Sequence, residues 1–288
     1  MKTDKHPSSP LPEEDRLFSK LGLPFSTQKE DKWTQMQLII EEEINPFSKK
    51  RQTYHWMIAA SVVLLLCLSV FRFYSTEITA RKGETIQFVL PDGSTVHLNA
   101  SSRLRYHPLW WWANRAIQLE GEAYFEVKKG SRFEVSSKQG KTSVLGTKFN
   151  IFSRENAYEV FCSQGVVTVS SPSLNQVDTL RAGDFTVWAE KGWDKKTSYQ
   201  DQNPTAWTAG EISYSQQSLL RVLKELERTY DISIRIDESW ASRQISSGRF
   251  TLPEQAEQVL KIVCAPFDIR ITKISVNEFS LSNNRHHE

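Results

Sequence analysis

The sequence predicts a mixed fold with a short α-helical arm, one transmembrane helix, an all-β domain of the sandwich or roll type, and a small α+β module ordered βαβ–βαββ. Three observations predict it: an uncharged apolar run, a long region in which apolar and polar residues alternate, and a final region of alternating strand and helix patterns. The expected boundaries are 1–54 for the arm, 55–75 for the transmembrane helix, 76–200 for the β domain and 205–284 for the module.

Composition argues against nucleic-acid binding and against a metal or redox centre. The 288 residues allow two or three folded units, and the net charge of +2 comes from 36 basic and 34 acidic residues without a basic stripe. Cys67, Cys162 and Cys264 lie far apart and form no CxxC pair. Cys162 and Cys264 each lie in an apolar run, so buried unpaired thiols are favoured over a disulfide between them. No cofactor is expected.

The apolar run from Trp56 to Phe71 reads WMIAASVVLLLCLSVF and contains no charge, Gly or Pro. As a helix, the stretch from His55 to Tyr74 covers about 30 Å, which matches the hydrocarbon thickness of a bilayer. Aromatic residues at both ends suit the interfaces, and Arg72 can extend its side chain toward the headgroups. A signal peptide is disfavoured because a long polar segment comes first, and a core helix because almost no polar positions interrupt the run.

Flanking charges and domain size together indicate the orientation of this helix. Lys49, Lys50 and Arg51 form a compact basic triplet before it, whereas the basic residues after it are more scattered. The triplet favours a cytoplasmic N-terminus, and the long β-rich region that follows has the composition of a translocated globular domain. We therefore expect a single-pass protein of the inner (cytoplasmic) membrane with a periplasmic C-terminus.

The arm before the membrane is expected to be largely helical. Residues 1–12 are rich in Pro and Ser and are predicted to be disordered, and a short helix is predicted over 13–21. Thr27 and Glu30 then have capping-box spacing. A single apolar stripe follows at helical spacing, formed by Trp33, Met36, Ile40 and Ile44. Such a stripe either binds a cytoplasmic protein, packs on the neighbouring helix or lies on the membrane surface.

Beyond the membrane, the clearest local prediction is a β-hairpin over residues 84–99, ETIQFVLPDGSTVHLN, in which Pro91-Asp92-Gly93-Ser94 forms the turn. Further alternating runs at about ten-residue spacing indicate a β-sandwich or roll. In the final region, helices are predicted over Gln217–Tyr230 and Pro253–Val263, with strands around them.

The sequence contains no recognisable catalytic motif. Asp92 has the residue neighbours that a tight turn requires, and the histidines form neither an HExxH motif nor a serine-hydrolase arrangement. Glu120, Glu122 and Glu126 are expected on one solvated face of a strand rather than as a catalytic carboxylate pair. The triplet Trp110-Trp111-Trp112 either covers an end of the sandwich or forms an exposed surface for a partner or a sugar ring.

Several segments carry a family resemblance. LPDGSTVHLNASSRLRY (90–106), LEGEAYFEVKKG (119–130) and VLGTKFNIFSR (144–154) resemble the motif series of the periplasmic FecR domain. WTAGEISYSQQSLLRVLKELERTYDISI (207–234) and SSGRFTLPEQAEQVLKIVCAPFDIRI (246–271) resemble the C-terminal module that accompanies that domain. FSKLGLPFSTQKEDKWTQM resembles the N-terminal arm of one subgroup.

The resemblance implies an anti-sigma factor without enzymatic activity. It implies that the arm holds an extracytoplasmic-function (ECF) sigma factor, and the stripe Trp33, Met36, Ile40 and Ile44 is the expected contact. It further implies that the C-terminal module pairs with the signalling domain of a TonB-dependent outer-membrane transducer, and that site proteases complete the release in some members. This arm lacks the longer helical segment with paired Trp motifs that many members carry, so activation of the sigma factor is an alternative to inhibition. A membrane-anchored periplasmic glycan- or ligand-binding module is the alternative function.

Overall fold

The computed structural model describes residues 28–155, 157–171, 176–189, 192–196 and 203–283. The expected disordered segment 1–12, the helix over 13–21 and the capping residue Thr27 lie outside these ranges. By its contacts the chain divides into two units, Met1–Leu68 and Ser69–Glu288.

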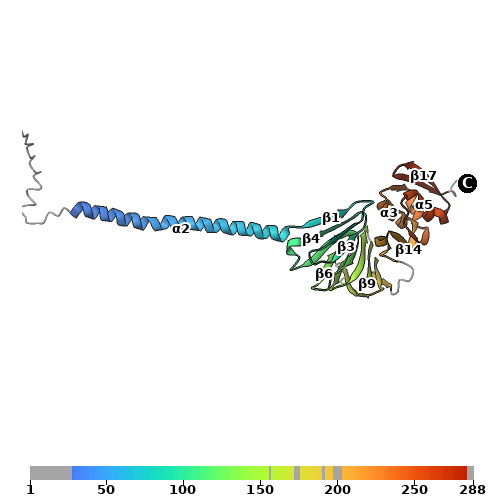
Figure 1. Ribbon diagram of the computed structural model, residues 1–288, viewed down its shortest axis with the longest axis horizontal. Coiled ribbons are helices and arrows are strands. Elements are labelled where there is room, and N and C mark those ends of the chain that lie inside the picture. Colours follow the sequence, from blue (N-terminus) through green and yellow to red (C-terminus); the bar gives the residue numbers. More distant parts are fainter. Residues whose placement is uncertain (1–27, 156, 172–175, 190–191, 197–202, 284–288) are drawn as a thin grey trace, which may run out of the picture. The chain divides into compact units, whose positions relative to one another are not determined.

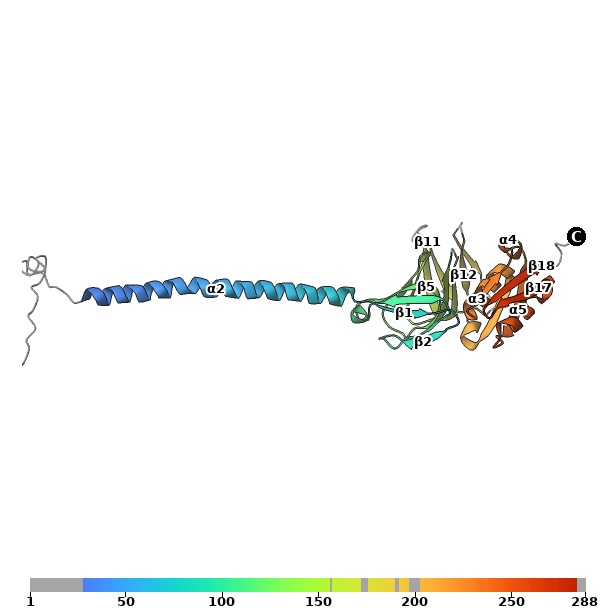
Figure 2. The same ribbon diagram turned by 90° about the horizontal axis from the view of Figure 1, so that it is seen from above.

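The first described element is a single long helix, α2 (Gln28–Phe73), which Figures 1 and 2 show as one unbroken rod. The arm helix and the transmembrane helix, expected as separate elements, are therefore continuous. Pro46 lies inside α2, where it removes one backbone donor without ending the helix. The window Thr53–Phe73 has 21 residues and a mean hydropathy of 2.2, and none of it is buried within the described chain. This window is long and apolar enough to cross a membrane, which fits a single-pass membrane protein.

Over the described residues, the β domain has thirteen strands in two hydrogen-bonded layers that share β5. One layer has the order β1-β4-β5-β6-β7-β10-β11 and the other β2-β3-β5-β8-β9-β12-β13. The strands are β1 (Thr76–Ala80), β2 (Ile86–Val89), β3 (Thr95–Leu98), β4 (Ser102–Tyr106), β5 (Arg115–Glu126), β6 (Phe133–Ser136), β7 (Lys141–Val144), β8 (Lys148–Arg154), β9 (Ala157–Gln164), β10 (Val166–Ser171), β11 (Gln176–Arg181), β12 (Phe185–Ala189) and β13 (Gly192–Lys196), with a short 3-10 helix, η1 (Pro108–Trp110), between β4 and β5.

The predicted hairpin is confirmed, because β2 and β3 pair antiparallel from Ile86–Leu98 to Val89–Thr95. The turn residue Asp92 accepts hydrogen bonds from the backbone N–H (3.0 Å) and the hydroxyl (2.8 Å) of Ser94. It also forms an ion pair with the buried Arg115 at the start of β5. The turn interpretation of Asp92 therefore holds, and the carboxylate additionally ties the hairpin to the other layer.

Strand β5 belongs to both layers and changes from one to the other at Gly121. Its first half pairs with β4 and β6, whereas residues from Gly121 onward pair with β8 and then β3. Gly121 has a φ of +107°, and an added Cβ would lie 2.7 Å from the Cα of Ser102. Only glycine satisfies both constraints, so the crossing strand depends on this residue.

Aromatic and aliphatic side chains fill the space between the two layers. Phe125, Phe149 and Phe133 form the centre, with Phe125 and Phe149 stacked at 5.0 Å between ring centroids and Phe133 edge-on to Phe125 at 6.1 Å. Cys162 is a free thiol in this core, as expected, and its burial raises its pKa to about 11.

The C-terminal module has two small sheets, β14-β16 and β15-β18-β17, and two principal helices, α3 and α5 (Figures 1 and 2). Its elements are η2 (Ala206–Ala209), β14 (Glu211–Ser218), α3 (Leu219–Thr229), β15 (Ser233–Arg235), α4 (Glu238–Ala241), β16 (Ile245–Thr251), α5 (Ala256–Cys264), η3 (Ala265–Phe267), β17 (Ile269–Ser275) and β18 (Glu278–Asn283). Leu223, Leu226, Val259 and Phe279 are in its core, together with the free thiol of Cys264.

Both helices of the module begin later than their patterns predict. Helix α3 starts at Leu219 because β14 continues to Ser218, whose hydroxyl accepts a hydrogen bond from the N–H of Arg221 (3.3 Å) and caps the helix. Helix α5 starts at Ala256 rather than at Pro253.

Candidate functional site at the seam between the β domain and the C-terminal module

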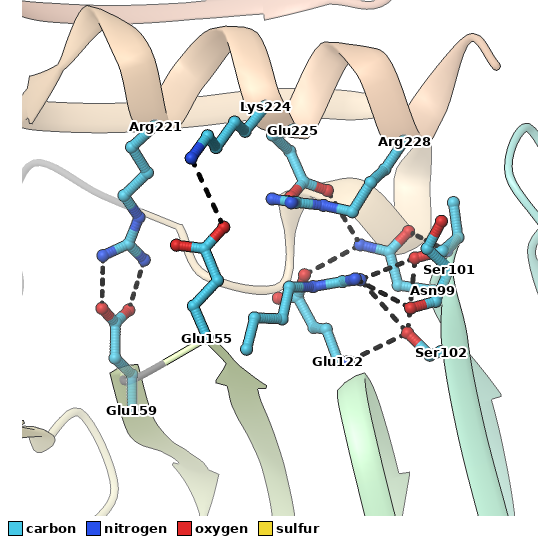
Figure 3. Close-up of polar contacts among 12 residues, drawn as sticks. Asn99, Ser101, Ser102, Glu122, Glu155, Glu159, Arg221, Lys224, Glu225 and Arg228 are labelled. Atoms are coloured by element: carbon cyan, nitrogen blue, oxygen red, sulfur yellow. Dashed lines mark hydrogen bonds and ion pairs between the residues drawn. The ribbon is translucent and has the colours of Figure 1, made fainter. Parts of the chain in front are cut away.

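One face of α3 packs against the β domain through charged side chains, and we call this contact the seam (Figure 3). Helix α3 buries Leu219, Val222, Leu223 and Leu226 in its own module. Its polar residues recur three to four positions apart and therefore share the opposite face, which points at the strand ends of the β domain. The seam consists of Asn99, Ala100, Ser101, Ser102, Glu122, Arg154, Glu155, Glu159, Arg221, Lys224, Glu225 and Arg228.

At one end of the seam, Arg221 and Glu159 form a bidentate ion pair, with N–O distances of 2.5 and 2.7 Å. Glu159 lies on β9 and its side chain is 11% exposed, whereas that of Arg221 is 35% exposed. The guanidinium carbon of Arg221 also lies 4.7 Å from the centre of the Phe152 ring. A planar guanidinium that pairs bidentately and stacks on an aromatic ring has a defined geometry that a lysine cannot reproduce.

Arg154 at the end of β8 organises the loop that receives α3. Its guanidinium donates to the carbonyl oxygens of Ala100 (2.6 Å) and Ser101 (2.9 Å) and to the hydroxyl of Ser102 (3.1 Å). Ser102 in turn accepts from the N–H of Glu122 (2.9 Å), the residue after the crossing glycine. The loop between β3 and β4 is therefore held from two sides.

Two carboxylates approach each other in the middle of the seam, Glu122 from β5 and Glu225 from α3. The Asn99 amide donates to both, at 2.8 Å to Glu122 and 3.4 Å to Glu225, and the Asn150 amide donates to Glu122 at 2.9 Å. Glu122 was predicted to lie on a solvated strand face, and this prediction is wrong because its side chain is buried beneath α3. Glu120, on the other side of the crossing, is exposed as expected.

The two carboxylates have opposite pKa shifts. Burial, and then repulsion by Glu225, raises the pKa of Glu122 from 4.5 to about 7. Burial also acts to raise the pKa of Glu225, but Arg228 and Arg154 outweigh it and hold that pKa below its ordinary value. Arg228 Nη2 lies 2.7 Å from the carboxylate of Glu225. Near neutral pH the seam therefore has one ionised carboxylate and one that exchanges its proton.

Backbone and indole contacts extend the seam beyond the charges. The N–H of Gly83, just after β1, donates to the carbonyl of Arg228 at 2.7 Å. The indole of Trp207 in η2 donates to the side-chain oxygen of Asn150 at 3.3 Å. A cavity of about 130 Å³ opens beside Glu122 and Asn150 and is lined on the module side by Tyr214 and Arg221.

The residues proposed from sequence to contact a sigma factor lie elsewhere, on α2. Trp33, Met36, Ile40 and Ile44 all fall within this helix, as the periodicity predicts. The side chain of Met36 is 59% exposed, and those of the other three lie outside the described side chains. Their sigma-binding role stays a prediction.

The tryptophan triplet does not form one exposed surface. Trp111 is buried, and its ring packs edge-on against Tyr106 at 5.5 Å and Phe133 at 5.8 Å. Trp111 therefore covers an end of the sandwich, which is one of the two alternatives that the sequence left open for the triplet. Trp112 is exposed and Trp110 is half-buried.

No group of three or more His, Cys, Asp or Glu side chains among the described residues is arranged to hold a metal ion. The seam instead joins two folded modules through complementary charges.

Removing the Arg221 guanidinium should weaken the seam. In an Arg221→Met variant, the largely buried Glu159 loses its partner, so we expect the free energy of unfolding to fall by about 1–3 kcal/mol. The ion pair between Arg235 and Glu278 is a matched control, because Arg235 is mostly exposed and an Arg235→Met change should cost less than about 1 kcal/mol. Urea unfolding of the full chain in detergent measures the free energy of unfolding of both variants. Equal losses in the two variants would contradict a special contribution of the seam.

The raised pKa of Glu122 predicts a pH dependence of stability. The folded chain binds a proton that the unfolded chain releases above about pH 4.5, so stability should fall as pH rises from about 4.5 to about 7 and then level off. Glu225, with its lowered pKa, acts in the opposite sense and only below about pH 4.5. Glu122→Gln should remove the decline, which we expect to be on the order of 1–3 kcal/mol. Glu120→Gln is the matched control and should retain it; unfolding curves at pH 5 and pH 8 distinguish the two.

Comparison with known proteins gives two family matches, one within the β domain and one within the C-terminal module. Residues 76–168 match the family model of the FecR protein, and residues 211–279 match that of the FecR C-terminal region, together more than half of the chain. No curated protein sequence matches at a significant level.

Two crystal structures of a candidate anti-sigma factor from Parabacteroides distasonis are similar to this chain, each with a TM-score of 0.66. Their sequences are 28% and 29% identical to it, and the matches cover 73% of this chain and 100% and 99% of theirs. The paired family matches and the shared fold lead to one assignment: the chain belongs to the FecR family of anti-sigma factors.

Proposed function

We propose that this chain is a non-enzymatic relay in the inner membrane, with its arm in the cytoplasm and its two folded modules in the periplasm. The C-terminal module receives a signal from the signalling domain of a TonB-dependent transducer. The arm holds or activates an ECF sigma factor, and stepwise cleavage by site proteases completes its release.

The observation that carries this proposal is the order of the parts along the chain. A helix with an apolar window of 21 residues separates a short polar arm from modules that match the FecR domain and its C-terminal partner domain. A relay needs a binding element on each side of the membrane and a continuous connection between them. The basic triplet before the window favours a cytoplasmic arm.

The arm supports sigma binding through the stripe Trp33, Met36, Ile40 and Ile44. These residues lie on one face of a helix, and such a face binds in an apolar groove of a partner protein. Met36 is exposed to solvent, as a residue available for a partner must be.

The C-terminal module supports transducer binding through the edge strand β17. In the three-stranded sheet, β17 pairs with β18 on one side and ends the sheet on the other. An edge strand offers backbone donors and acceptors to an added strand. Ile274, on the same strand, is exposed and supplies an apolar contact beside it.

Substitution of the stripe should abolish sigma binding. The double variant Met36→Asp/Ile40→Asp places charges on the apolar face, and we expect retention of the cognate sigma factor by the detergent-solubilised full chain to fall at least tenfold. Gln35→Asp places a charge on an exposed residue of the same helix that lies off this face, and it should retain the sigma factor. Undiminished retention by the stripe variant would remove this binding face from the proposal.

A charge on the edge strand should block the transducer contact. Ile274→Lys should weaken binding of the transducer's signalling domain about tenfold or more, because one buried apolar side chain contributes about 1.5–3 kcal/mol. Val177→Lys on β11, an exposed position of the β domain, is the control and should bind normally. The ligand is the purified signalling domain of a TonB-dependent transducer from the same organism, and calorimetry measures its affinity. Equal binding by both variants would place the contact elsewhere.

A further inference from the structure

The segment between β4 and β5 presents apolar side chains that the β domain does not bury. Trp112 is 76% exposed and Leu109 is 42% exposed, although Trp111 between them is part of the core. The rings of Trp110 and Trp112 lie 5.6 Å apart, so the exposed side chains form one patch. We call Leu109, Trp110 and Trp112 the foot of the β domain.

The foot packs on the residues that end α2. The ring of Trp110 meets Phe71 edge-on at 5.8 Å, and the guanidinium of Arg72 lies 5.7 Å from the centre of the same indole. The imidazole of His107 lies 3.0 Å from the carbonyl oxygen of Tyr74 and can form a hydrogen bond with it. These contacts all fall within the unit Ser69–Glu288 and hold the foot against the last turn of α2.

The position of that last turn relative to a bilayer follows from the length of the apolar window. Its 21 residues, Thr53–Phe73, span about 30 Å at 1.5 Å per residue, which is the thickness of the hydrocarbon core. Phe71 and Phe73 therefore lie at the boundary between hydrocarbon and headgroups. Trp110, in contact with Phe71, is at the same level, and Trp112 is its neighbour.

The chemistry of the foot matches that boundary. Indoles combine a large apolar ring with one N–H donor and concentrate at membrane interfaces for this reason. Arg72 can reach lipid phosphates while its guanidinium remains beside the Trp110 ring. An exposed tryptophan that would be a liability on a surface in water is favourable where lipid covers it.

We propose that the β domain rests on the membrane through this foot, with Trp112 and Leu109 inserted among the lipid headgroups at the C-terminal end of α2. The partner is the lipid surface itself. The proposal relies on the membrane span in the proposed function, but not on the sigma factor or on the transducer. It makes the junction between helix and β domain a lipid-anchored joint rather than a free tether.

Spin labels on the full-length chain in phospholipid nanodiscs test this proposal. Ala113 is exposed beside Trp112, so Cys67→Ser/Ala113→Cys places a nitroxide at the foot and keeps the tryptophan. Cys67→Ser/Val276→Cys labels the exposed turn between β17 and β18 as an aqueous control. The native Cys67, inside the apolar window, is the lipid control, and the buried thiols of Cys162 and Cys264 are shielded from labelling.

We expect the label at 67 to be more accessible to oxygen than to a water-soluble nickel complex, the label at 276 to show the reverse, and the label at 113 to have a ratio between the two, as a position at headgroup level should. Adding Trp112→Ser should lower the oxygen-to-nickel accessibility ratio at 113 severalfold. Two results would overturn the proposed contact of the foot with lipid: an accessibility ratio at 113 equal to that at 276, or a ratio at 113 that Trp112→Ser does not change. In either case the label at Cys67 should still show the accessibility of a lipid-facing position. A water-exposed label at Cys67 would overturn the span itself, which separates the two failures. A water-exposed label at 113, together with a shift of tryptophan fluorescence emission when peptidoglycan fragments are added, would contradict the lipid contact and indicate that the foot binds glycan.

Discussion

The close approach of Gly121 to Ser102 is the constraint on which the rest of the extramembrane structure depends. Because β5 crosses between the layers at this glycine, one strand contributes its first half to the layer of β4 and β6 and its second half to that of β3 and β8. The crossing also brings the N–H of Glu122 to the hydroxyl of Ser102. The position of Glu122 beneath α3, and hence the central carboxylate pair of the seam, follows from this local backbone geometry.

The seam joins its two modules mainly through charge, and this distinguishes it from an ordinary hydrophobic domain contact. A guanidinium–carboxylate pair at one end, a carboxylate pair in the middle and backbone contacts at the other end require a defined alignment of α3. Charged contacts of this kind add specificity more than affinity, because desolvation offsets much of their attraction. In the proposed relay, a contact that is specific but not strong would allow the two modules to respond to a partner.

Much of the β domain could be predicted from sequence because its strands bury one face. In β3, Val96 and Leu98 are buried and alternate with polar residues, and the Pro-Asp-Gly-Ser turn before them has one local solution. Strands β1 and β13, with sequences TEITA and GWDKK, lack this signal, because charged and polar residues dominate them. Their place in the sheet is set by tertiary pairing.

The seam could not be predicted, because its partners are far apart in sequence and each looks like an ordinary surface residue. Arg221 and Glu159 are 62 positions apart, and no local pattern relates them. Glu122 did carry a signal, since the glycine before it interrupts the alternation that would otherwise place it beside Glu120. The continuity of α2 was not predicted, because the apolar stripe ends at Ile44 and the uncharged run begins only at Trp56, so that no single periodic pattern joins the two.

Strand β1 shows how the two ends of the extramembrane unit are connected. Tyr74, just before it, lies beside His107 at the foot, and Gly83, just after it, donates its N–H to Arg228 at the end of α3. Between these points β1 pairs with β4 along its whole length, from Thr76–Tyr106 to Ala80–Ser102. Five extended residues cover about 16 Å. The hydrogen bonds with β4 fix the register of this strand. In the proposed relay, β1 is therefore the strand that joins α3 at the seam to the end of α2, and it does so outside the sandwich core.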